Sequence, residues 1–192
     1  MRDEEMIRGN IPMSKMEVRA TSLAFLDLYT AKSLLDIGAG TGSVGIEAAR
    51  RHPHLKVTAI ERVSEGVELI KANAAQFGVT VNTVEALAPC DLGDETFDRV
   101  FIGGTGKQLN PILDWLKEKH LEDGGIIVVN TIAIESLGET LKALETSGFS
   151  EIEGSMIQAS RLDNLGQYHY FKPLNPCYVI KAMWRKSACQ SL

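Results

Sequence analysis

Short apolar runs and stretches of helical spacing alternate along most of this 192-residue chain. The apolar runs predict strands at residues 34–37, 57–61, 79–85, 100–102 and 126–129. The last of these runs shows no polar alternation, which is typical of a parallel strand covered on both faces. Strands that alternate with helices indicate an α/β fold, with a doubly wound, mostly parallel sheet and helices on both of its sides.

The stretches between these strands predict helices with recognisable ends. The first helix begins at Ser14, because Ser14 and Glu17 have the spacing of a capping box, and it runs to about Leu28. Met16, Ala20, Leu23 and Leu26 then follow one another at helical spacing. Later helices are predicted at residues 43–51, 67–77, 109–116 and 137–144. Gly78 and Gly148 are placed to close two of them in the left-handed conformation.

The pattern changes after residue 148. Residues 152–159 and 178–180 predict two strands with no helix between them, and residues 161–176 predict a loop. Two strands without a crossover helix pair in an antiparallel manner. We therefore expect a seven-stranded sheet that ends in an antiparallel strand pair. Aromatic residues fill positions 168–171 of the predicted loop, and alternation would turn two of them towards a core.

Composition excludes several classes of protein. A net charge of -5 has the wrong sign for a protein that binds duplex DNA mainly through its phosphates. Cys90, Cys177 and Cys189 show no CxxC spacing, and no histidine–cysteine cluster predicts a metal site. The first residues lack the apolar segment of a secretory signal, and no apolar run is long enough to span a bilayer. We expect a single cytoplasmic domain over residues 1–192, with no membrane partner.

A glycine-rich turn, residues 36–42 (DIGAGTG), lies where the first predicted strand meets a helix. Open parallel sheets bind nucleotides at this position, because glycines let backbone N–H groups approach a ligand closely. Glu61 ends the next predicted strand, where a carboxylate can accept hydrogen bonds from both ribose hydroxyls. Together these features predict a ligand that contains adenosine.

Two adenosine cofactors match this turn to different degrees. Residues 40–45 (GTGSVG) fit the GxGxxG fingerprint of dinucleotide binding, which would indicate NAD. In that fingerprint the first glycine directly follows the strand; here Gly38 does so, which puts Ser43 where the third glycine belongs. Asp36 suits the ammonium group of an amino acid and would lie badly beside a pyrophosphate. We therefore favour S-adenosylmethionine over NAD.

The DxGxGxG turn with its downstream acid resembles class I S-adenosylmethionine-dependent methyltransferases, whose seven-stranded Rossmann-like sheet ends in an antiparallel hairpin. The resemblance implies that the glycine loop cradles the methionine part, that Glu61 binds the ribose, and that residues 85–89 border the adenine. The implied cofactor-binding residues are Asp36, Gly38, Ala39, Gly40, Thr41, Gly42, Glu61, Leu87 and Ala88. Leu87 departs from the acidic or polar residue often found at its position, whereas Ala88 can still offer its backbone N–H.

Motifs along the whole chain resemble, more narrowly, the decarboxylating precorrin methyltransferases of cobalamin biosynthesis. Residues 4–19, 36–47, 101–106 and 174–180 carry this resemblance. It implies methyl transfer to C-15 of a cobalt-precorrin-6B-type tetrapyrrole, with loss of carbon dioxide from the C-12 acetate, by a homotetramer. It also implies that residues 1–29 contribute to the active site and that Ser14 contacts the cofactor carboxylate.

A nucleic-acid substrate is disfavoured by a missing motif. Nucleic-acid amino methyltransferases carry Asn/Asp-Pro-Pro-Tyr after the fourth strand, where this chain has a glycine-rich loop, residues 103–107. The similar residues 175–178 (NPCY) come too late in the strand order to replace it. The expected partner is therefore a small tetrapyrrole and not a nucleic acid.

A tetrapyrrole with several carboxylates needs cationic and polar donors at the mouth of its pocket. We predict that Gly104 and Lys107, in the loop after the fourth strand, bind the substrate. Weaker candidates are Arg8, Lys15 and Arg161. Residues 168–171 could stack on the flat macrocycle. No catalytic acid or base is assigned, because the sulfonium already activates the methyl group. Another small-molecule methyltransferase, an NAD-dependent oxidoreductase and a non-catalytic cofactor-binding module stay open as alternatives.

Overall fold

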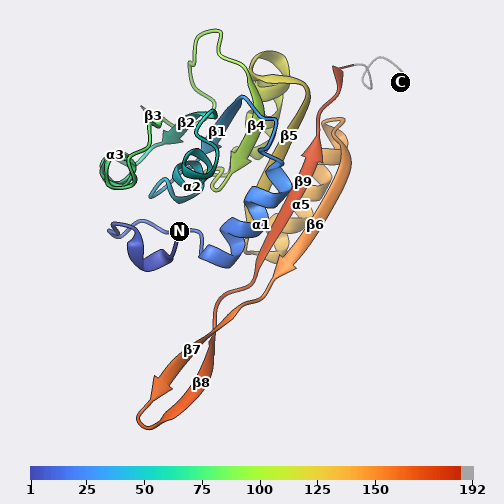
Figure 1. Ribbon diagram of the computed structural model, residues 1–192. Coiled ribbons are helices and arrows are strands. Elements are labelled where there is room, and N and C mark those ends of the chain that lie inside the picture. The colour runs from blue at the N-terminus through green and yellow to red at the C-terminus, as the bar shows by residue number, and fades with distance from the viewer. Residues whose placement is uncertain (187–192) are drawn as a thin grey trace.

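A twisted sheet with helices on both faces forms the body of the molecule in the computed structural model, which describes residues 1–186 (Figure 1). Within this range seven strands form one sheet in the order β3-β2-β1-β4-β5-β9-β6, and β7 pairs with β8 in a separate hairpin. The strands are β1 (Ser33–Ile37), β2 (Lys56–Glu61), β3 (Asn82–Glu85), β4 (Phe97–Ile102), β5 (Leu121–Thr131), β6 (Ser150–Ile157), β7 (Ser160–Leu165), β8 (Tyr168–Pro173) and β9 (Cys177–Met183). The helices are η1 (Asp3–Glu5), α1 (Met16–Leu26), α2 (Ser43–Arg51), α3 (Ser64–Phe77), α4 (Leu109–Trp115), the π-helical turn η2 (Leu116–His120) and α5 (Ile134–Thr146).

The direction of the strands follows the prediction. Strands β1 to β5 pair in parallel, and β9 runs antiparallel to both of its neighbours, β5 and β6. The predicted seven-stranded, mostly parallel sheet with an antiparallel pair at its end is therefore confirmed. Gly78 and Gly148 both take positive φ angles at the ends of α3 and α5, as the sequence predicts.

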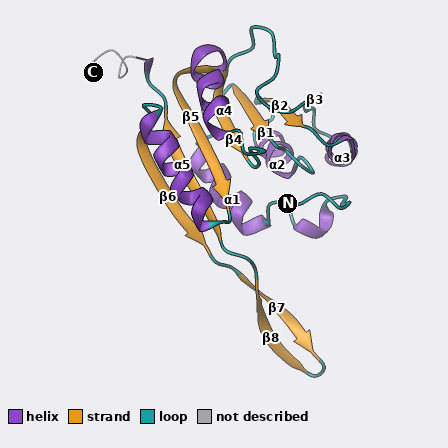
Figure 2. Cartoon of the chain, turned by 180° about the vertical axis from the view of Figure 1, so that it is seen from behind, coloured by secondary structure: helices purple, strands orange, loops and turns teal. Residues whose placement is uncertain are grey.

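Helices cover the sheet in two layers. Helices α1, α2 and α3 lie on one face, and α4 and α5 lie on the other, as the reverse view shows (Figure 2). The apolar side chains of the central strands point alternately into two buried clusters, one under each helical layer. Because the parallel strands end at the same edge, the loops after β1, β2, β3 and β4 gather there, and this edge positions the candidate site.

The first helix differs from its prediction. Helix α1 begins at Met16, its N-cap is Lys15, and no side chain within the described chain caps it, so the Ser14–Glu17 capping box is wrong. Glu17 instead binds Arg161, which takes the carboxylate away from the helix end. Of the four residues at helical spacing, Leu23 and Leu26 are buried, whereas Met16 and Ala20 are exposed. The helix buries Arg19 and Ser22 in their place.

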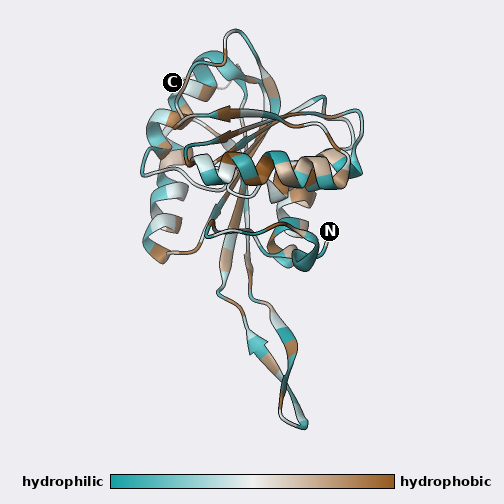
Figure 3. Ribbon diagram, turned by 90° about the vertical axis from the view of Figure 1, so that its left-hand side faces the viewer, coloured by the Kyte–Doolittle hydropathy of each residue, from teal (hydrophilic) through white to brown (hydrophobic). Residues whose placement is uncertain are grey.

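The segment predicted as a loop at residues 161–176 mostly forms the hairpin of β7 and β8. The hairpin extends away from the body of the molecule (Figure 1), and apolar residues alternate with polar ones along it (Figure 3). Residues 168–171 form most of β8 and all four are exposed, so the expectation that two of them point into a core is wrong. Periodicity suggested a core face because it does not reveal that a strand leaves the globular body.

Two expectations concern absences. Among residues 1–186, no helix has the length and apolar character needed to cross a membrane. No group of histidine, cysteine and acidic side chains in that same range is arranged to hold a metal ion. Cys90 and Cys177 are free thiols, and Cys189 lies outside the described residues.

Candidate active site

A pocket of about 660 Å³ opens at the carboxyl edge of the parallel strands. One side is formed by the glycine loop after β1 and by the ends of β2, β3 and β4. The opposite side is formed by residues 11–15, by residues 130–132 at the end of β5, and by residues 173–175 at the base of the hairpin. A volume of this size lies within the range of small-molecule sites.

Most of the residues predicted to bind cofactor or substrate surround this pocket. Those that line it are Ser14, Gly38, Ala39, Gly40, Glu61, Leu87, Ala88 and Gly104. Four others lie behind or beside the lining within the described chain: Asp36, Thr41, Gly42 and Lys107. The fold therefore brings together side chains and backbone from β1, β2, β3, β4 and the N-terminal segment.

The glycines of the loop are required by close backbone approaches. Gly38 has a φ of 66°, and a Cβ there would lie 2.5 Å from the carbonyl oxygen of Gly104. Gly40 has a φ of 59°, and a Cβ there would lie 2.9 Å from the carbonyl oxygen of Pro12. Only glycine combines these φ angles with such close neighbours. The glycine loop thus fits between the β4 loop and the N-terminal segment with its backbone facing the pocket.

Gly42 has a different role, because a Cβ on it would meet side chains of the core. That atom would lie 2.9 Å from Ile46 Cδ1 and 3.0 Å from Ile70 Cγ1. Gly42 is the N-cap of α2, with a φ of 76°, and helix α2 extends from the loop into the buried layer. The third glycine therefore allows α2 to pack against α3.

Glu61 lies at the end of β2 with both carboxylate oxygens already bound by backbone groups. The N–H of Gly40 donates to Oε2 at 2.8 Å, and the N–H of Val63 donates to Oε1 at 2.9 Å. The side chain is buried and still lines the pocket. Each oxygen has a second lone pair, so the carboxylate is fixed in place and can accept further hydrogen bonds from a ligand.

Asp36 lies behind the glycine loop, fully buried. Its Oδ2 accepts a hydrogen bond from the N–H of Gly45 at 2.9 Å, and its Oδ1 has no partner among residues 1–186. Burial raises the pKa of Asp36 to about 7, the Gly45 hydrogen bond opposes this, and the charge of Glu61 adds to it. The hydroxyl of Thr41 is also buried without a partner in the described chain. Two polar side chains behind the loop thus retain unused hydrogen-bonding capacity.

The N-terminal segment crosses the glycine loop and closes one side of the pocket. Asn73 of α3 accepts from the N–H of Ile7 at 2.7 Å and donates to the carbonyl oxygens of Ile7 and Thr41. The N–H of Asn10 donates to Glu65 at 2.8 Å. The carbonyl oxygen of Ser14 accepts from Arg19 at 2.6 Å. These bonds fix residues 11–15 against the loop, with Ser14 at the pocket wall.

Comparison with known proteins identifies the family. The model for a precorrin methyltransferase domain matches residues 6–185. The chain is 42% identical, over 94% of both chains, to the cobalt-precorrin-6B C(15)-methyltransferase (decarboxylating) of Salmonella typhimurium. The chain belongs to the precorrin methyltransferase family. Its class I methyltransferase fold and its family were both correctly predicted from the sequence motifs.

Solved structures of this family share the whole fold. The precorrin-6y C5,15-methyltransferase of Geobacter metallireducens superposes with a TM-score of 0.87 at 34% identity, covering 96% of this chain and 97% of that one. A precorrin 8W decarboxylase from Methanobacterium thermoautotrophicum gives a TM-score of 0.83 at 27% identity, covering 95% and 98%. The hairpin and the N-terminal segment therefore belong to the region that this precorrin methyltransferase has in common with its relatives.

The cations near the pocket are placed differently from one another. Lys15 lines the pocket, whereas Lys107 lies exposed beside the lining in the loop after β4, with a φ of 68°. Arg8 is exposed, and it too is absent from the lining formed by the described residues. Arg161 is held by acidic side chains of the N-terminal segment and α1. Lys15 is thus the predicted cation that the fold brings to the pocket wall.

Sequence reasoning missed several residues of the pocket. Arg62 directly follows Glu61, and its Nη1 would lie 3.9 Å from a Cβ on Gly106. Asn130 ends β5 beside the pocket, where its Nδ2 donates to the Oγ of the buried Ser22 at 3.0 Å. Both positions follow a predicted strand end, which was the available signal. Residues 173–175 could not be found in this way, because they were assigned to a loop.

The arrangement fits an adenosyl cofactor on structural grounds alone. Gly38 and Gly40 let the loop backbone pack closely against Gly104 and Pro12 while it lines the pocket, and Glu61 presents a fixed carboxylate beside it. The exposed side chain of Leu87 and the buried Ala88 line the same side, next to the end of β3. Backbone donors, a carboxylate and an apolar surface are the complements of an amino-acid moiety, a ribose and an adenine.

Proposed function

We propose that this chain transfers a methyl group from S-adenosylmethionine to C-15 of a cobalt-precorrin-6B-type tetrapyrrole and removes the C-12 acetate carboxyl group as carbon dioxide. The observation that carries the proposal is the 42% identity to a relative named for this reaction, over 94% of both chains. The pocket supports it, since the glycine loop and Glu61 form one side and leave an opposite side for a second molecule.

The cofactor would be held by the residues around the glycine loop. The backbone of residues 38–42 would hold the methionine part, Glu61 the ribose hydroxyls, and Leu87 and Ala88 the adenine. Ser14 would contact the cofactor carboxylate from the N-terminal segment, and Asp36 would act on the ammonium group from behind the loop. The bound cofactor supplies an activated methyl group.

The protein's own contribution is to orient the substrate and exclude water. Residues 11–15 and 173–175 cover the outer side of the pocket, and Asn130 is fixed by Ser22 at the end of β5. Alignment of two reactants converts their encounter into a unimolecular step and lowers the barrier without a strong base. Gly104, Lys107 and Lys15 would contact substrate at the mouth, with the two lysines pairing with peripheral carboxylates.

The decisive experiment is an anaerobic incubation of the enzyme with cobalt-precorrin-6B and S-adenosylmethionine, followed by mass spectrometry of the tetrapyrrole. We expect the product to gain one methyl group and lose one molecule of carbon dioxide. A product with neither change would contradict the proposal. Calorimetric titration with S-adenosylhomocysteine and with NAD forms the second arm, and we expect binding of the first and none of the second.

We further propose that copies of the chain assemble, as a homotetramer, through the hairpin of β7 and β8. A two-stranded hairpin is marginally stable in water by itself, and this one exposes large apolar side chains. The exposed apolar residues are Leu162, Leu165, Tyr168, Tyr170 and Phe171. Light scattering should give a tetramer for the native chain, and Leu165→Lys with Phe171→Lys should reduce its mass. A native monomer would contradict this part of the proposal.

A cytoplasmic location is part of the same proposal. Cys90 and Cys177 form no disulfide within residues 1–186, as expected for a protein of a reducing compartment. Fractionation of cells that express the chain should place it with cytoplasmic markers.

A further inference from the structure

We propose that Arg161 is a positioning residue that sets the outer wall of the substrate pocket by joining the hairpin to the N-terminal segment and α1. This inference rests on the proposed function, because its readout is the binding of the tetrapyrrole. Arg161 was a weaker candidate for contact with the substrate; its contacts assign it to the support of the wall.

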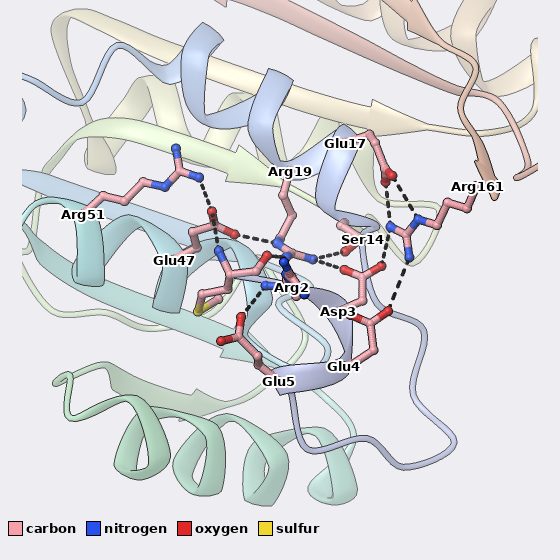
Figure 4. A network of polar contacts seen from close by, with 11 residues as sticks. Arg2, Asp3, Glu4, Glu5, Ser14, Glu17, Arg19, Glu47, Arg51 and Arg161 are labelled. Carbon is pink, nitrogen blue, oxygen red and sulfur yellow. Dashed lines mark hydrogen bonds and ion pairs between the residues drawn. The ribbon is translucent and has the colours of Figure 1, made fainter. Parts of the chain in front are cut away.

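The guanidinium group of Arg161 donates hydrogen bonds to two carboxylates, and its Nη1 lies 3.9 Å from a third, that of Glu4 (Figure 4). Its Nε and Nη2 donate to the two carboxylate oxygens of Glu17 at 2.9 and 2.7 Å. Nη2 also donates to Oδ2 of Asp3 at 2.8 Å. Arg161 lies on β7, Glu17 in the first turn of α1, and Asp3 in η1. One side chain therefore connects three elements that are distant in sequence.

The Asp3 side of this contact is anchored in the core. Asp3 is buried, and its other oxygen accepts from Arg19 Nη1 at 2.8 Å. The fully buried Arg19 also donates to Glu47 of α2 at 2.8 Å and to the carbonyl oxygen of Ser14. A buried, fully bonded network of this kind has one preferred geometry. Arg161 thus attaches the hairpin to a rigid base.

The residues that Arg161 connects lie next to both halves of the outer pocket wall in the chain. Residues 11–15, which line the pocket, lie in the chain between Asp3 and Glu17, the two partners of Arg161. The hairpin that carries Arg161 ends at Pro173, and residues 173–175 line the pocket from its other strand. The spacing between the two halves of the outer wall is therefore set where Arg161 bridges them.

The shape of the guanidinium matters for this role. Its planar set of donors binds Glu17 through two parallel bonds and Asp3 through a third, which the single ammonium of lysine cannot reproduce. Hydrogen bonds from Arg161 lower the pKa of Glu17, and although burial raises the pKa of Asp3, bonds from Arg19 and Arg161 bring it below its ordinary value. Both carboxylates are therefore charged at neutral pH, and their contacts with Arg161 persist there.

The test separates substrate binding from cofactor binding, and light scattering on each variant checks that assembly is unchanged. In Arg161→Met we expect the KM for the tetrapyrrole to rise about tenfold, with kcat and the Kd for S-adenosylhomocysteine changed less than about threefold. Glu17→Gln weakens the same contact from α1 without altering the hairpin, because it removes the charge and one acceptor oxygen, and it should raise KM in the same direction. Arg161→Lys should recover part of the loss. The double variant should not exceed Arg161→Met by much, because the Glu17 contact is already lost when Arg161 is removed.

Lys172→Met is the matched control. Lys172 pairs with Arg161 in the register of the hairpin, and its ammonium lies 4.0 Å from Asp163 at an exposed position. We expect a native KM and, by light scattering, a native mass for this variant. An unchanged KM in both Arg161→Met and Glu17→Gln would overturn the inference, as would an equal rise in Lys172→Met. A native enzyme that does not convert the tetrapyrrole would instead refute the proposed function.

Discussion

The carboxyl edge of the parallel strands and the hairpin of β7 and β8 differ in what determines their structure. At the edge, buried strands, positive-φ glycines and the bonds of Glu61 to backbone N–H groups fix every element against its neighbours. The hairpin has a turn at Gly166 and a ladder of backbone pairs, yet its apolar side chains face solvent in the single chain. The edge is specified by contacts within one chain, whereas the hairpin, on our proposal, needs contacts with other copies.

This difference separates two roles that lie side by side in the site. On our proposal, the inner side of the pocket holds the cofactor through backbone groups and one carboxylate. The outer side is lined by residues 11–15 and 173–175, and on our proposal it contacts the substrate and is positioned through the hairpin. Substitutions on the inner side should therefore change cofactor affinity, and substitutions on the outer side should change substrate affinity.

A glycine pair, one from each region, gives the largest predicted contrast. Gly38→Ala puts a Cβ 2.5 Å from the carbonyl oxygen of Gly104 at a φ of 66°. Because a backbone atom cannot move aside cheaply, we expect the Kd for S-adenosylhomocysteine to rise about 1,000-fold or more. In the hairpin, Gly166 has a φ of 62° with nothing within 4 Å of a Cβ.

The control, Gly166→Ala, carries the same conformational strain without the collision. It should cost about 1 kcal/mol of stability and leave cofactor affinity unchanged. Calorimetry and thermal unfolding measure the two effects. If the Kd of Gly38→Ala for S-adenosylhomocysteine stayed within tenfold of the native value, the glycine loop would not be the part of the site that holds the cofactor.

Asp36 should give the inner side a distinctive pH dependence. Its pKa is about 7 in the folded chain and about 3.9 when unfolded, so unfolding releases its proton between these values. Its contribution to stability is therefore present below about pH 4 and is lost as the pH rises towards 7. Asp36→Asn removes this dependence, and its stability relative to the native protein should increase by about 3 kcal/mol between pH 5 and pH 8.

Urea unfolding at the two pH values measures this difference. Repeating it with saturating S-adenosylhomocysteine tests the role proposed for Asp36, since a ligand ammonium near the carboxylate would favour its charged form and reduce the pH effect. If the stability gained by Asp36→Asn between the two pH values were less than about 1 kcal/mol without ligand, burial would not raise the pKa of Asp36 to this extent.

Glu61 should have a smaller but selective effect on cofactor binding. Glu61→Ala removes both the proposed ribose contacts and the bonds to Gly40 and Val63. We expect the Kd for S-adenosylhomocysteine to rise about 30-fold, which corresponds to about 2 kcal/mol. The control is Glu68→Ala, an exposed acid of α3 that pairs with Lys71. An unaltered Kd in Glu61→Ala would remove the carboxylate from the proposed site.

The sequence predicted most of the inner side because local rules dominate there. The apolar runs predicted β1 and β2, and the spacing of the glycines predicted the turn between β1 and α2. The start of α1 shows where local rules fail. Ser14 and Glu17 have the spacing of a capping box, but the helix begins after Lys15 without a side-chain cap. Arg161, far away in sequence, binds the Glu17 carboxylate instead. An ion pair between residues far apart in the sequence overrides the local motif, and the spacing of residues in the sequence does not reveal such a pair.

The hairpin was missed for a related reason. Residues 161–176 contain Asn, Gly and Pro, which indicate loops, and the alternation of residues 168–171 suggests a buried face. Both signals are present in the fold as a turn at Gly166 and a strand with exposed apolar residues. A pattern of alternation shows that a strand has two faces but not which molecule covers them.

The outer side yields the smallest and most discriminating prediction, a comparison of two lysines. Lys107 was the predicted substrate ligand, but Lys15 lines the pocket and Lys107 lies beside it. We expect Lys15→Met to raise the KM for the tetrapyrrole about fivefold and Lys107→Ala about twofold, each with unchanged cofactor affinity. Lys56→Ala, at the opposite end of β2, should change neither. Because these pairs form near solvent, both effects should shrink at high salt. If Lys107→Ala had the larger effect, the loop after β4 would have to close over the substrate, and the pocket wall at Lys15 would not be where its carboxylates bind.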